Sequence, residues 1–353
     1  MKRPTGNTFT RLVFALLLSA VSLSAAANPQ AAKEADTALK FAHEGKYEMA
    51  IPHYQAAIKL DPKLPGIYLN LGLAFFKTNK LKEAAATLER ATKAEPNNFQ
   101  ARVLLGMSYF GCRRFDDAAA QLKQATAKQP QNVELRYKLA QSYLWSKQYQ
   151  AAVEEFRYLL TINPDSAPIH MLLGEVLDAS NREEEATREF EIAVKATPPE
   201  PEAHFGLGFL YWKQKRFEDA RREFEAQLSI DPNHAQALTY LGDSVMHAGN
   251  NSEAEKYLRK ALSLDPNIRL AHRDLGAVLA SRKDFEGATK HLREAIRIAP
   301  SNPDAHYELG RLLLSMGQKK EAQAEFDTVK KLAKEQQEPL VDKMQEGRAN
   351  PAP

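Results

Sequence analysis

Regularly spaced histidines are the first residues in this sequence that suggest a chemistry, and that chemistry is metal binding. His170 and His204 are 34 residues apart, and so are His272 and His306. Imidazole nitrogens are common zinc ligands, but all ligands of one ion lie about 2 Å from it. Whether these histidines can meet therefore depends on the elements that carry them.

Catalysis by a nucleophile or binding of a phosphate would need other patterns. Cys112 is the single cysteine, so the chain has no internal disulfide. Its equivalents in the repeats described below include Ser146, Ser180 and Ala248, which favours a small, partly buried residue at a helix end. The sequence carries no Gly-rich phosphate loop and no nucleophilic Ser elbow. We therefore expect no catalytic residue, no metal site and no cofactor.

A repeat of 34 residues dominates the chain. Prolines recur at this spacing from Pro62 to Pro300, and ten residues after each proline stands a glycine or, once, an alanine. Another column is always alanine, and the residue four positions later is always large and apolar. The alanine column comprises Ala50, Ala84, Ala118, Ala152, Ala186, Ala220, Ala254, Ala288 and Ala322. A period of this kind, held without insertion, indicates one supersecondary unit used repeatedly.

Each period predicts two helices. In Pro201–His234, the segments EAHFGLGFLYWKQ and FEDARREFEAQLSI both carry apolar residues at helical spacing. Pro232 cannot continue the preceding helix and ends it. Gly242 costs about 1 kcal/mol of helix propensity relative to Ala. We therefore expect such glycines where a first helix lies close against the second helix of its own repeat.

This architecture argues against a shared metal site. Histidines one period apart are separated by a whole intervening helix, and neighbouring helix axes lie about 8–10 Å apart. They cannot reach one ion without other ligands, so packing or surface roles are favoured. The charged stretch REEEATREFE is interpreted as a solvated helix face.

Leu207-Gly208-x2-Tyr211, then Ala220-x3-Phe224, then Pro232 resemble the tetratricopeptide repeat (TPR) pattern. The resemblance covers nearly the whole chain after residue 30. The chain departs from it at the Trp position, which holds Tyr68, Arg102, Arg136, His170, His204, Leu238, His272 and His306. The resemblance implies an all-α fold, an α-solenoid in which helix-turn-helix repeats form a right-handed superhelix with a concave groove. It also implies a non-catalytic protein that holds other proteins or peptides.

Nine repeats are expected between residues 31 and 336, without insertion. Their predicted limits are 31–64, 65–98, 99–132, 133–166, 167–200, 201–234, 235–268, 269–302 and 303–336. In the last helix, Lys330 stands where earlier repeats mostly have an apolar residue and is followed by Lys331, and Lys334 stands where they have Pro. A terminal repeat needs a wettable face because no neighbour covers it. Residues 337–353 are therefore interpreted as a polar C-terminal cap or tail.

The first 27 residues are interpreted as a cleavable signal peptide. Lys2, Arg3 and Arg11 precede and flank an apolar run that ends at Leu23, and small residues lead up to Ala27. The run is about a dozen residues long, whereas a membrane-spanning helix needs about 20. We expect an exported mature chain without a membrane span, periplasmic in a Gram-negative bacterium or, alternatively, secreted.

Charge gives no reason to expect nucleic acid as a partner. Residues 1–27 hold three of the 48 basic side chains and none of the 45 acidic ones. The mature chain is therefore formally neutral, with 45 residues of each sign. A neutral surface does not attract nucleic acid or anionic lipid electrostatically.

The inner side of the first helices is the candidate peptide-binding groove, as the TPR resemblance implies. Its columns are apolar and aromatic up to Trp212 and become polar afterwards, at Thr239, Asp243, Arg273 and Arg311. The candidate groove residues are Leu69, Leu73, Phe76, Val103, Met107, Phe110, Tyr137, Leu144, Trp145, Met171, Phe205, Phe209 and Trp212. The alternative is that these side chains only fill the wall of the superhelix.

Two functions are compatible with these observations. The first is an envelope adaptor that binds a protein or peptide, holding an apolar or amphipathic segment in the groove. The second is a structural scaffold subunit of an envelope assembly, such as polysaccharide export, cytochrome maturation or outer-membrane assembly. An adaptor binds isolated peptides, whereas a scaffold co-purifies with a fixed membrane complex.

Overall fold

The computed structural model describes residues 28–197 and 200–337. The predicted signal peptide and residues 338–353 of the predicted tail lie outside the described residues. The chain divides into two compact units, Met1–Ala186 and Thr187–Pro353. Helices and the turns between them make up the described part of both units, which contains no strand. The prediction of an all-α solenoid is confirmed.

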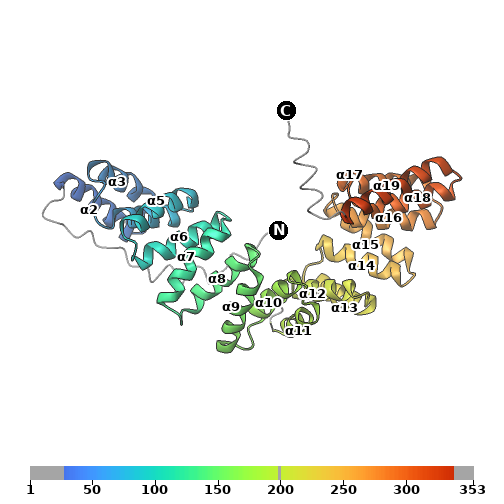
Figure 1. Cartoon of the computed structure of the whole chain (residues 1–353), viewed down its shortest axis with the longest axis horizontal. Coiled ribbons are helices and arrows are strands. Elements are labelled where there is room, and N and C mark those ends of the chain that lie inside the picture. Colours follow the sequence, from blue (N-terminus) through green and yellow to red (C-terminus); the bar gives the residue numbers. More distant parts are fainter. Residues whose placement is uncertain (1–27, 198–199, 338–353) are drawn as a thin grey trace. The chain divides into compact units, whose positions relative to one another are not determined.

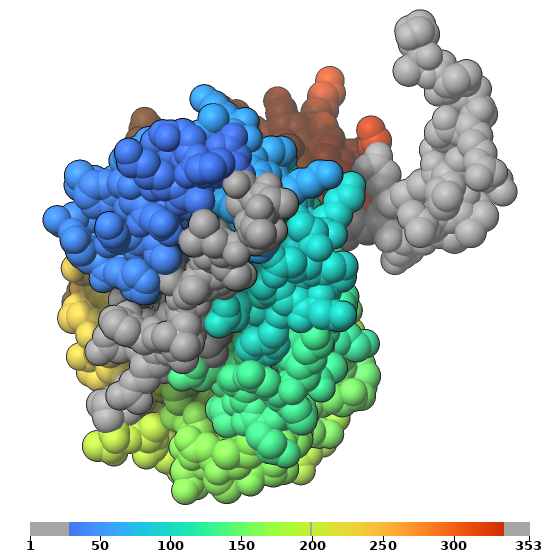
Figure 2. All heavy atoms as spheres, turned by 90° about the vertical axis from the view of Figure 1, so that its left-hand side faces the viewer, coloured from blue at the N-terminus to red at the C-terminus, as the bar shows by residue number. Residues whose placement is uncertain are grey.

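Helices follow one another in pairs through the first unit (Figure 1). In the space-filling view, the earliest helices (blue and cyan) succeed one another along the surface in chain order (Figure 2). The helices are α2 (Pro29–His43), α3 (Tyr47–Leu60), α4 (Ile67–Lys77), α5 (Leu81–Ala94), α6 (Phe99–Gly111), α7 (Phe115–Lys128), α8 (Val133–Trp145), α9 (Tyr149–Ile162) and α10 (Ala167–Ala179). The next helix, α11 (Glu183–Ala193), contains the boundary between the units.

The second unit continues the same alternation of first and second helices. Its helices are α12 (Ala203–Lys213), α13 (Phe217–Ile230), α14 (Ala235–His247), α15 (Asn251–Leu264), α16 (Arg269–Ser281), α17 (Phe285–Ile298), α18 (Pro303–Ser315) and α19 (Lys319–Gln337). The first helices α14, α16 and α18 therefore begin one period apart, as the spacing of the prolines predicts.

Where the structure describes it, the proline of a repeat stands between a second helix and the next first helix. At Pro232, α13 ends because Asp231 is extended, with φ −125° and ψ 94°. The Asp231 carboxylate accepts a hydrogen bond from the backbone N–H of Asn233 at 3.0 Å. His234 is also extended and caps α14 by accepting the N–H of Ala237 at 3.0 Å. The dipeptide Asp-Pro therefore encodes the stop of one helix and prepares the start of the next.

Close helix contact explains the glycine column. A Cβ added to Gly276 of α16 would lie 2.6 Å from Cγ of Leu292 on α17. A Cβ added to Gly208 would lie 2.8 Å from Cε1 of Phe224. Both distances are below van der Waals contact, so a side chain at either position would force the partner residue or the helix to move. The prediction that these glycines bring the two helices of a repeat together is confirmed, and the partner is the large apolar residue four positions after the alanine column.

A left-handed residue turns the chain between the two helices of a repeat. Lys215 has φ 59° and follows the last turn of α12. The N–H of Arg216 donates to Tyr211 O and the N–H of Lys215 donates to Trp212 O, both at 2.9 Å, which is a Schellman motif. The same column is left-handed at Gly45, Asn79, Arg113, Lys147, Asn181, Lys215, Gly249, Lys283 and Gly317. Residue type does not mark this column in the sequence, because glycine fills only three of its positions.

Candidate functional site

Three of the histidines that recur at one period, His204, His272 and His306, link the two helices of their own repeats. Nδ1 of His204 lies 2.7 Å from a carboxylate oxygen of Glu223 on α13. His272 faces His291 on α17, with 2.9 Å between their Nδ1 atoms. The same spacing of nineteen residues joins Glu34–His53, Arg102–Gln121, Arg136–Glu155 and His306–Glu325. In these repeats the position that holds Trp in the TPR pattern is thus occupied by one half of a polar clamp.

Several of these clamps also reach the preceding loop. Arg136 Nε donates to the carbonyl oxygen of Pro130 at 2.6 Å. Nε2 of the buried His170 lies 2.7 Å from the carbonyl oxygen of Pro164. The polar side chain therefore binds a carbonyl group that proline leaves outside the helix, which satisfies a backbone acceptor at the junction of two repeats.

Neither a metal cluster nor an activated thiol is found in the described ranges 28–197 and 200–337. No three His, Cys, Asp or Glu side chains there are arranged to hold a metal ion. Cys112 is half-buried at the C-terminal end of α6, and burial raises the pKa of its thiol. A raised pKa reduces the thiolate fraction on which nucleophilic attack depends.

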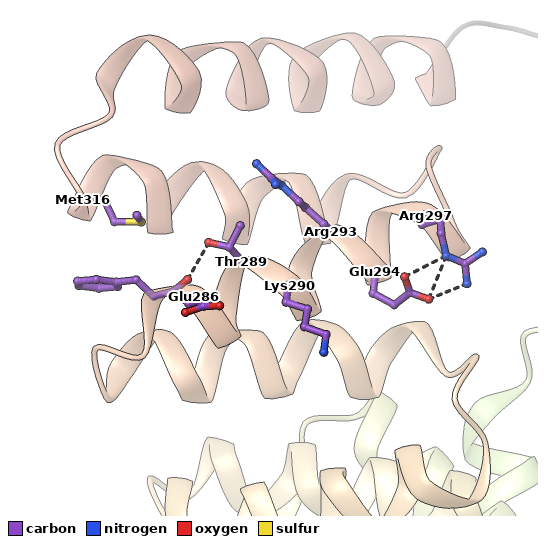
Figure 3. Close-up of a pocket in the computed structure, with 8 residues that line it drawn as sticks. Glu286, Thr289, Lys290, Arg293, Glu294, Arg297 and Met316 are labelled. Atoms are coloured by element: carbon purple, nitrogen blue, oxygen red, sulfur yellow. Dashed lines mark hydrogen bonds and ion pairs between the residues drawn. The ribbon is translucent and has the colours of Figure 1, made fainter.

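A groove opens on the surface of α17, with a volume of about 790 Å³ (Figure 3). Glu294 and Arg297 form an ion pair in it, with 2.6 Å between Oε1 and Nη2. The Thr289 hydroxyl donates to the backbone carbonyl of Phe285 at 2.7 Å. The lining residues are Phe285, Glu286, Thr289, Lys290, Arg293, Glu294, Arg297 and Met316. Charges of both signs line this open groove, and none of the predicted groove residues belongs to it.

The structure buries five of the candidate groove residues in the first unit. These are Leu69, Leu73, Val103, Met107 and Leu144, each at most 7% exposed. The other candidates of this unit are half-buried, namely Phe76, Phe110, Tyr137, Trp145 and Met171. The half-buried members are those that a ligand can reach without rearrangement of the packing. Binding by the set as a whole stays a prediction.

Aromatic rings gather around Trp145 in the first unit. Its centroid lies 5.0 Å from the ring of Phe110 on α6 and 5.4 Å from that of Phe115 on α7. Nζ of Lys138 stands 4.5 Å from the Phe110 centroid. These contacts belong to wall packing, because each ring is held by rings of neighbouring helices, and they also leave part of the rings accessible.

A larger aromatic cluster occupies the second unit and includes the other three candidates. Phe209 and Trp212 of α12 both contact Tyr240 of α14, at centroid distances of 5.3 and 4.9 Å. Phe205 lies 6.1 Å from Tyr240 and 4.8 Å from the ring of His234. Phe205, Phe209, Trp212 and Tyr240, which we call the aromatic cluster, are all half-buried. Sequence analysis found the three α12 residues and missed Tyr240.

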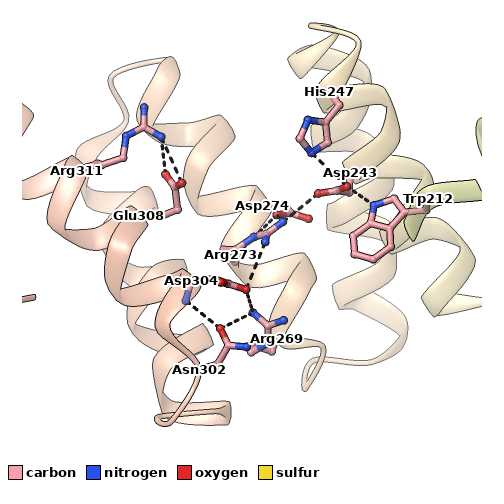
Figure 4. A network of polar contacts seen from close by, with 10 residues as sticks. All are labelled: Trp212, Asp243, His247, Arg269, Arg273, Asp274, Asn302, Asp304, Glu308 and Arg311. Carbon is pink, nitrogen blue, oxygen red and sulfur yellow. Dashed lines mark hydrogen bonds and ion pairs between the residues drawn. The ribbon is translucent and has the colours of Figure 1, made fainter. Parts of the chain in front are cut away.

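A polar network begins at the edge of this cluster (Figure 4). The indole Nε1 of Trp212 donates to Oδ2 of the buried Asp243 at 2.5 Å. Arg273 of α16 donates to Oδ1 of Asp243 at 3.0 Å and to Oδ1 of Asp274 at 2.6 Å. Its Nη1 also lies 3.8 Å from a carboxylate oxygen of Asp304 on α18. One arginine thus connects three consecutive first helices.

Charge is unbalanced inside this network. Asp243 and Asp274 are both buried at 0% exposure, while Arg273 is the one cation that contacts both. Burial raises the pKa of Asp274 well above its usual value, the Arg273 guanidinium opposes this, and the Asp243 carboxylate adds to it. Oδ2 of Asp274 is buried without a hydrogen-bond partner. Two buried carboxylates thus share one guanidinium, and the protonated form of Asp274 is favoured because a buried charge without a counter-charge of its own is costly.

Comparison with family models identifies the repeats. Models described as tetratricopeptide repeats match residues 69–111, 103–167, 207–267 and 239–303, and another matches 146–207 and 279–345. A model described as TPR repeat matches residues 39–79. The chain belongs to the tetratricopeptide repeat family. The TPR resemblance inferred from the sequence is confirmed, and with it the expectation of a protein-interaction module.

Solved structures support the same fold. The hetero-tetramer Cut9-Hcn1 of APC/C gives a TM-score of 0.54 at 13% identity, covering 82% of this chain and 57% of that chain. A tetratricopeptide repeat protein from Parabacteroides merdae gives 0.50 at 18% identity, covering 71% of this chain and all of its own. PilF of Pseudomonas aeruginosa gives a TM-score of 0.50 at 19% identity, covering 57% of this chain and 91% of that chain. At these identities the likeness concerns the fold alone.

Two further searches found nothing, one among curated proteins and one for membrane-spanning helices in the described part of the chain. No curated protein matches this chain. Within the described residues, no helix combines the length and apolar character needed to cross a bilayer.

Proposed function

We propose that this TPR protein is a non-catalytic adaptor of the cell envelope that binds an apolar or amphipathic segment of a protein partner. The observation that carries the proposal is the half-buried aromatic cluster of α12 and α14. Tyr and Trp are enriched among residues that dominate binding energy. Rings that already contact one another lose little conformational entropy when a ligand covers them.

The place of action is proposed to be the periplasm. Residues 1–27 have the three parts of a secretory signal, with cleavage after Ala27. Asn28 would then be the first mature residue, and it is also the N-cap of α2, accepting the N–H of Gln30 at 2.9 Å and that of Ala31 at 3.3 Å. Mass spectrometry of protein from a periplasmic extract should find Asn28 at the N-terminus. A cytoplasmic protein that retains residues 1–27 would contradict this.

The binding test compares two Phe→Ala variants. Phe209 belongs to the aromatic cluster, whereas Phe217 is also half-buried but stacks on His247 at 4.2 Å at the start of α13. Partners are captured from envelope extract by the wild type, and a peptide of the captured protein is titrated calorimetrically. Phe209→Ala should weaken binding by about 2 kcal/mol, roughly 30-fold, while Phe217→Ala should change it little.

Trp212→Ala is a poor variant for this purpose. It removes the indole that donates to the buried Asp243, so it would perturb the polar network as well as the cluster. Equal losses of affinity for Phe209→Ala and Phe217→Ala would mean that the rings only pack the wall. Co-purification with a fixed membrane complex, without affinity for isolated peptides, would favour the scaffold alternative.

A further inference from the structure

The last first-helix of the array exposes one face. Tyr307, Arg311 and Leu314 lie at positions i, i+4 and i+7 of α18, so they share a side of the helix. Tyr307 is 48% exposed and Leu314 is 51% exposed. The side chain of Arg311 is 61% exposed, and its Nη1 donates to both carboxylate oxygens of Glu308, at 3.2 and 3.3 Å. We call these three residues the α18 face.

In earlier repeats the same columns are covered by the next first helix. One period before the α18 face stand Arg273, Ala277 and Ala280, none of which is exposed. Arg273 meets Asp304 of α18 there. Two periods before stand Thr239, Asp243 and Met246 of α14, and Asp243 meets Arg273 of α16. The geometry of these junctions is that of one helix lying against the next, and α18 has no such neighbour among the described residues.

The opposite end of the array is built differently. Lys33 and Lys40 of α2 are exposed. In all later repeats their columns hold buried residues, such as Ala305 and Leu312 in α18. The first described helix therefore presents charged residues on the side where no other described helix packs, which is how a repeat array solvates its end. The α18 face presents a tyrosine and a leucine instead. A second copy stacking through α2 would place Lys33 and Lys40 toward this face, where they would meet Arg311.

We propose that the α18 face docks an amphipathic helix of a partner protein, which carries an acidic residue between two apolar turns. The register follows from the covered junctions. Tyr240 of α14 covers Phe209 and Trp212, and Asp274 occupies the same position one period later, next to Asp243. An incoming helix places this position against Arg311, where a carboxylate is complementary. Its flanking turns then cover Tyr307 and Leu314. This surface is independent of the aromatic cluster.

The test is a charge-swap cycle with a defined probe. The probe is a synthetic peptide of residues 301–317, held helical by an i,i+4 lactam, because this segment carries Glu308 at the required position with Ala305 and Leu312 one turn away. Fluorescence anisotropy should give submillimolar binding to the full chain. Arg311→Glu should weaken binding at least fivefold, and a probe with Glu308→Arg should restore it to within twofold.

Matched variants separate this surface from others. Arg293→Glu changes an exposed cation on α17 and should leave binding unchanged, as should Phe209→Ala in the aromatic cluster. Leu314→Ser should weaken binding without loss of thermal stability, because Leu314 is exposed. The proposal is overturned if binding is absent below 1 mM or if the swapped pair is not restored. It is also overturned if the probe binds only after residues 338–353 are deleted. A dimer of the protein alone in sedimentation, lost in Arg311→Glu, would overturn it as well.

Discussion

Single residues decide how each repeat is held together. Apart from Glu34, Tyr68 and Leu238, the column that normally holds Trp carries a histidine or arginine. For five of these six residues the structure shows a partner nineteen positions later. Glu223 and Glu325 accept from histidines in this way, whereas His291 meets another histidine. Two imidazoles can share one hydrogen bond when both are neutral, but a second proton has no acceptor. The repeat of α16 and α17 is therefore the acid-sensitive one.

This pair predicts a stability that depends on pH. Burial, with the neighbouring His272, lowers the pKa of His291 to about 4, while an unfolded histidine titrates near 6.5. Between these values the unfolded chain binds more protons, so stability falls as the pH decreases from about 6.5 to 4. After allowance for the solvent exposure of the ring, the loss should be about 1–2 kcal/mol.

Replacing His291 by Glu should remove this loss. The carboxylate would accept from His272 as Glu223 does from His204. Urea unfolding at pH 7 and pH 5 measures the effect, with His43→Glu outside the clamps as control. Because Asp274 contributes in the opposite sense in both proteins, the same change in stability between pH 7 and pH 5 for the wild type and for His291→Glu would contradict the prediction.

The carboxyl group of Asp274 should change the stability with pH in the sense opposite to that of His291. The pKa of its carboxyl group is raised in the folded chain. The folded state therefore binds the extra proton, and stability is lost as the pH rises through the folded pKa. Asp274→Asn mimics the protonated acid and should be the more stable protein at pH 8, by about 1–3 kcal/mol, and this difference should shrink as the pH falls toward about 3.9, the pKa of an unfolded Asp. Fluorescence of Trp212 during urea unfolding, in a Trp145→Phe background, reports on this site because the indole contacts Asp243.

At the scale of the helix pair, the sequence predicts where helices stop and pack but not how they turn. Pro232 and Gly208 reveal their roles through residue type alone, because proline and glycine have unique backbones. The left-handed turn at Lys215 has no such marker, since the Schellman hydrogen bonds impose it on any residue. The network from Trp212 to Asp304 was equally hidden. Its members lie about 30 residues apart, and only the packed first helices bring them together.

The turn column offers a stabilising substitution. Lys215 adopts φ 59°, which costs a residue with a Cβ about 1–2 kcal/mol relative to glycine. Part of this gain is offset by the greater entropy of glycine in the unfolded chain. Lys215→Gly should therefore stabilise the protein by about 0.5–1 kcal/mol in urea unfolding. Lys256→Gly, at an exposed helical position of α15, is the control and should destabilise it by about 1 kcal/mol.

The glycine column predicts a destabilising substitution. Gly276→Ala places a methyl group 2.6 Å from Cγ of Leu292, so α16 and α17 must separate or Leu292 must move. The cost should be about 1–3 kcal/mol. Hydrogen exchange should show the loosening mainly in residues 269–298, because repeat arrays share stability between neighbours. In the double variant with Leu292→Ala, the loss in free energy of unfolding should be smaller than the sum of the losses in the two single variants. Simple additivity would mean that the two residues do not touch.

At the scale of the whole molecule, the sequence predicts family and fold because the same pattern of residues recurs in every repeat. The binding surface could be read only in part. Leu69 and Val103 belong to the predicted groove columns, yet the structure buries both. Side chains in one column differ in exposure because the neighbouring repeat supplies different cover. A column therefore predicts a direction on the helix, and the packing decides how much of the side chain a ligand can reach.

Net charge leads to the last prediction. The chain from residue 28 onward has 45 basic and 45 acidic residues, so no long-range field favours or opposes a partner. If the aromatic cluster binds its ligand through burial of rings, screening has little to act on. Affinity of the partner peptide for the cluster should change less than twofold between 50 and 500 mM NaCl. The α18 face serves as an internal control, because its binding uses Arg311 and should weaken severalfold over the same range. A strong salt dependence at the cluster would mean that charged side chains, such as those of the Asp243 network, contribute to that site.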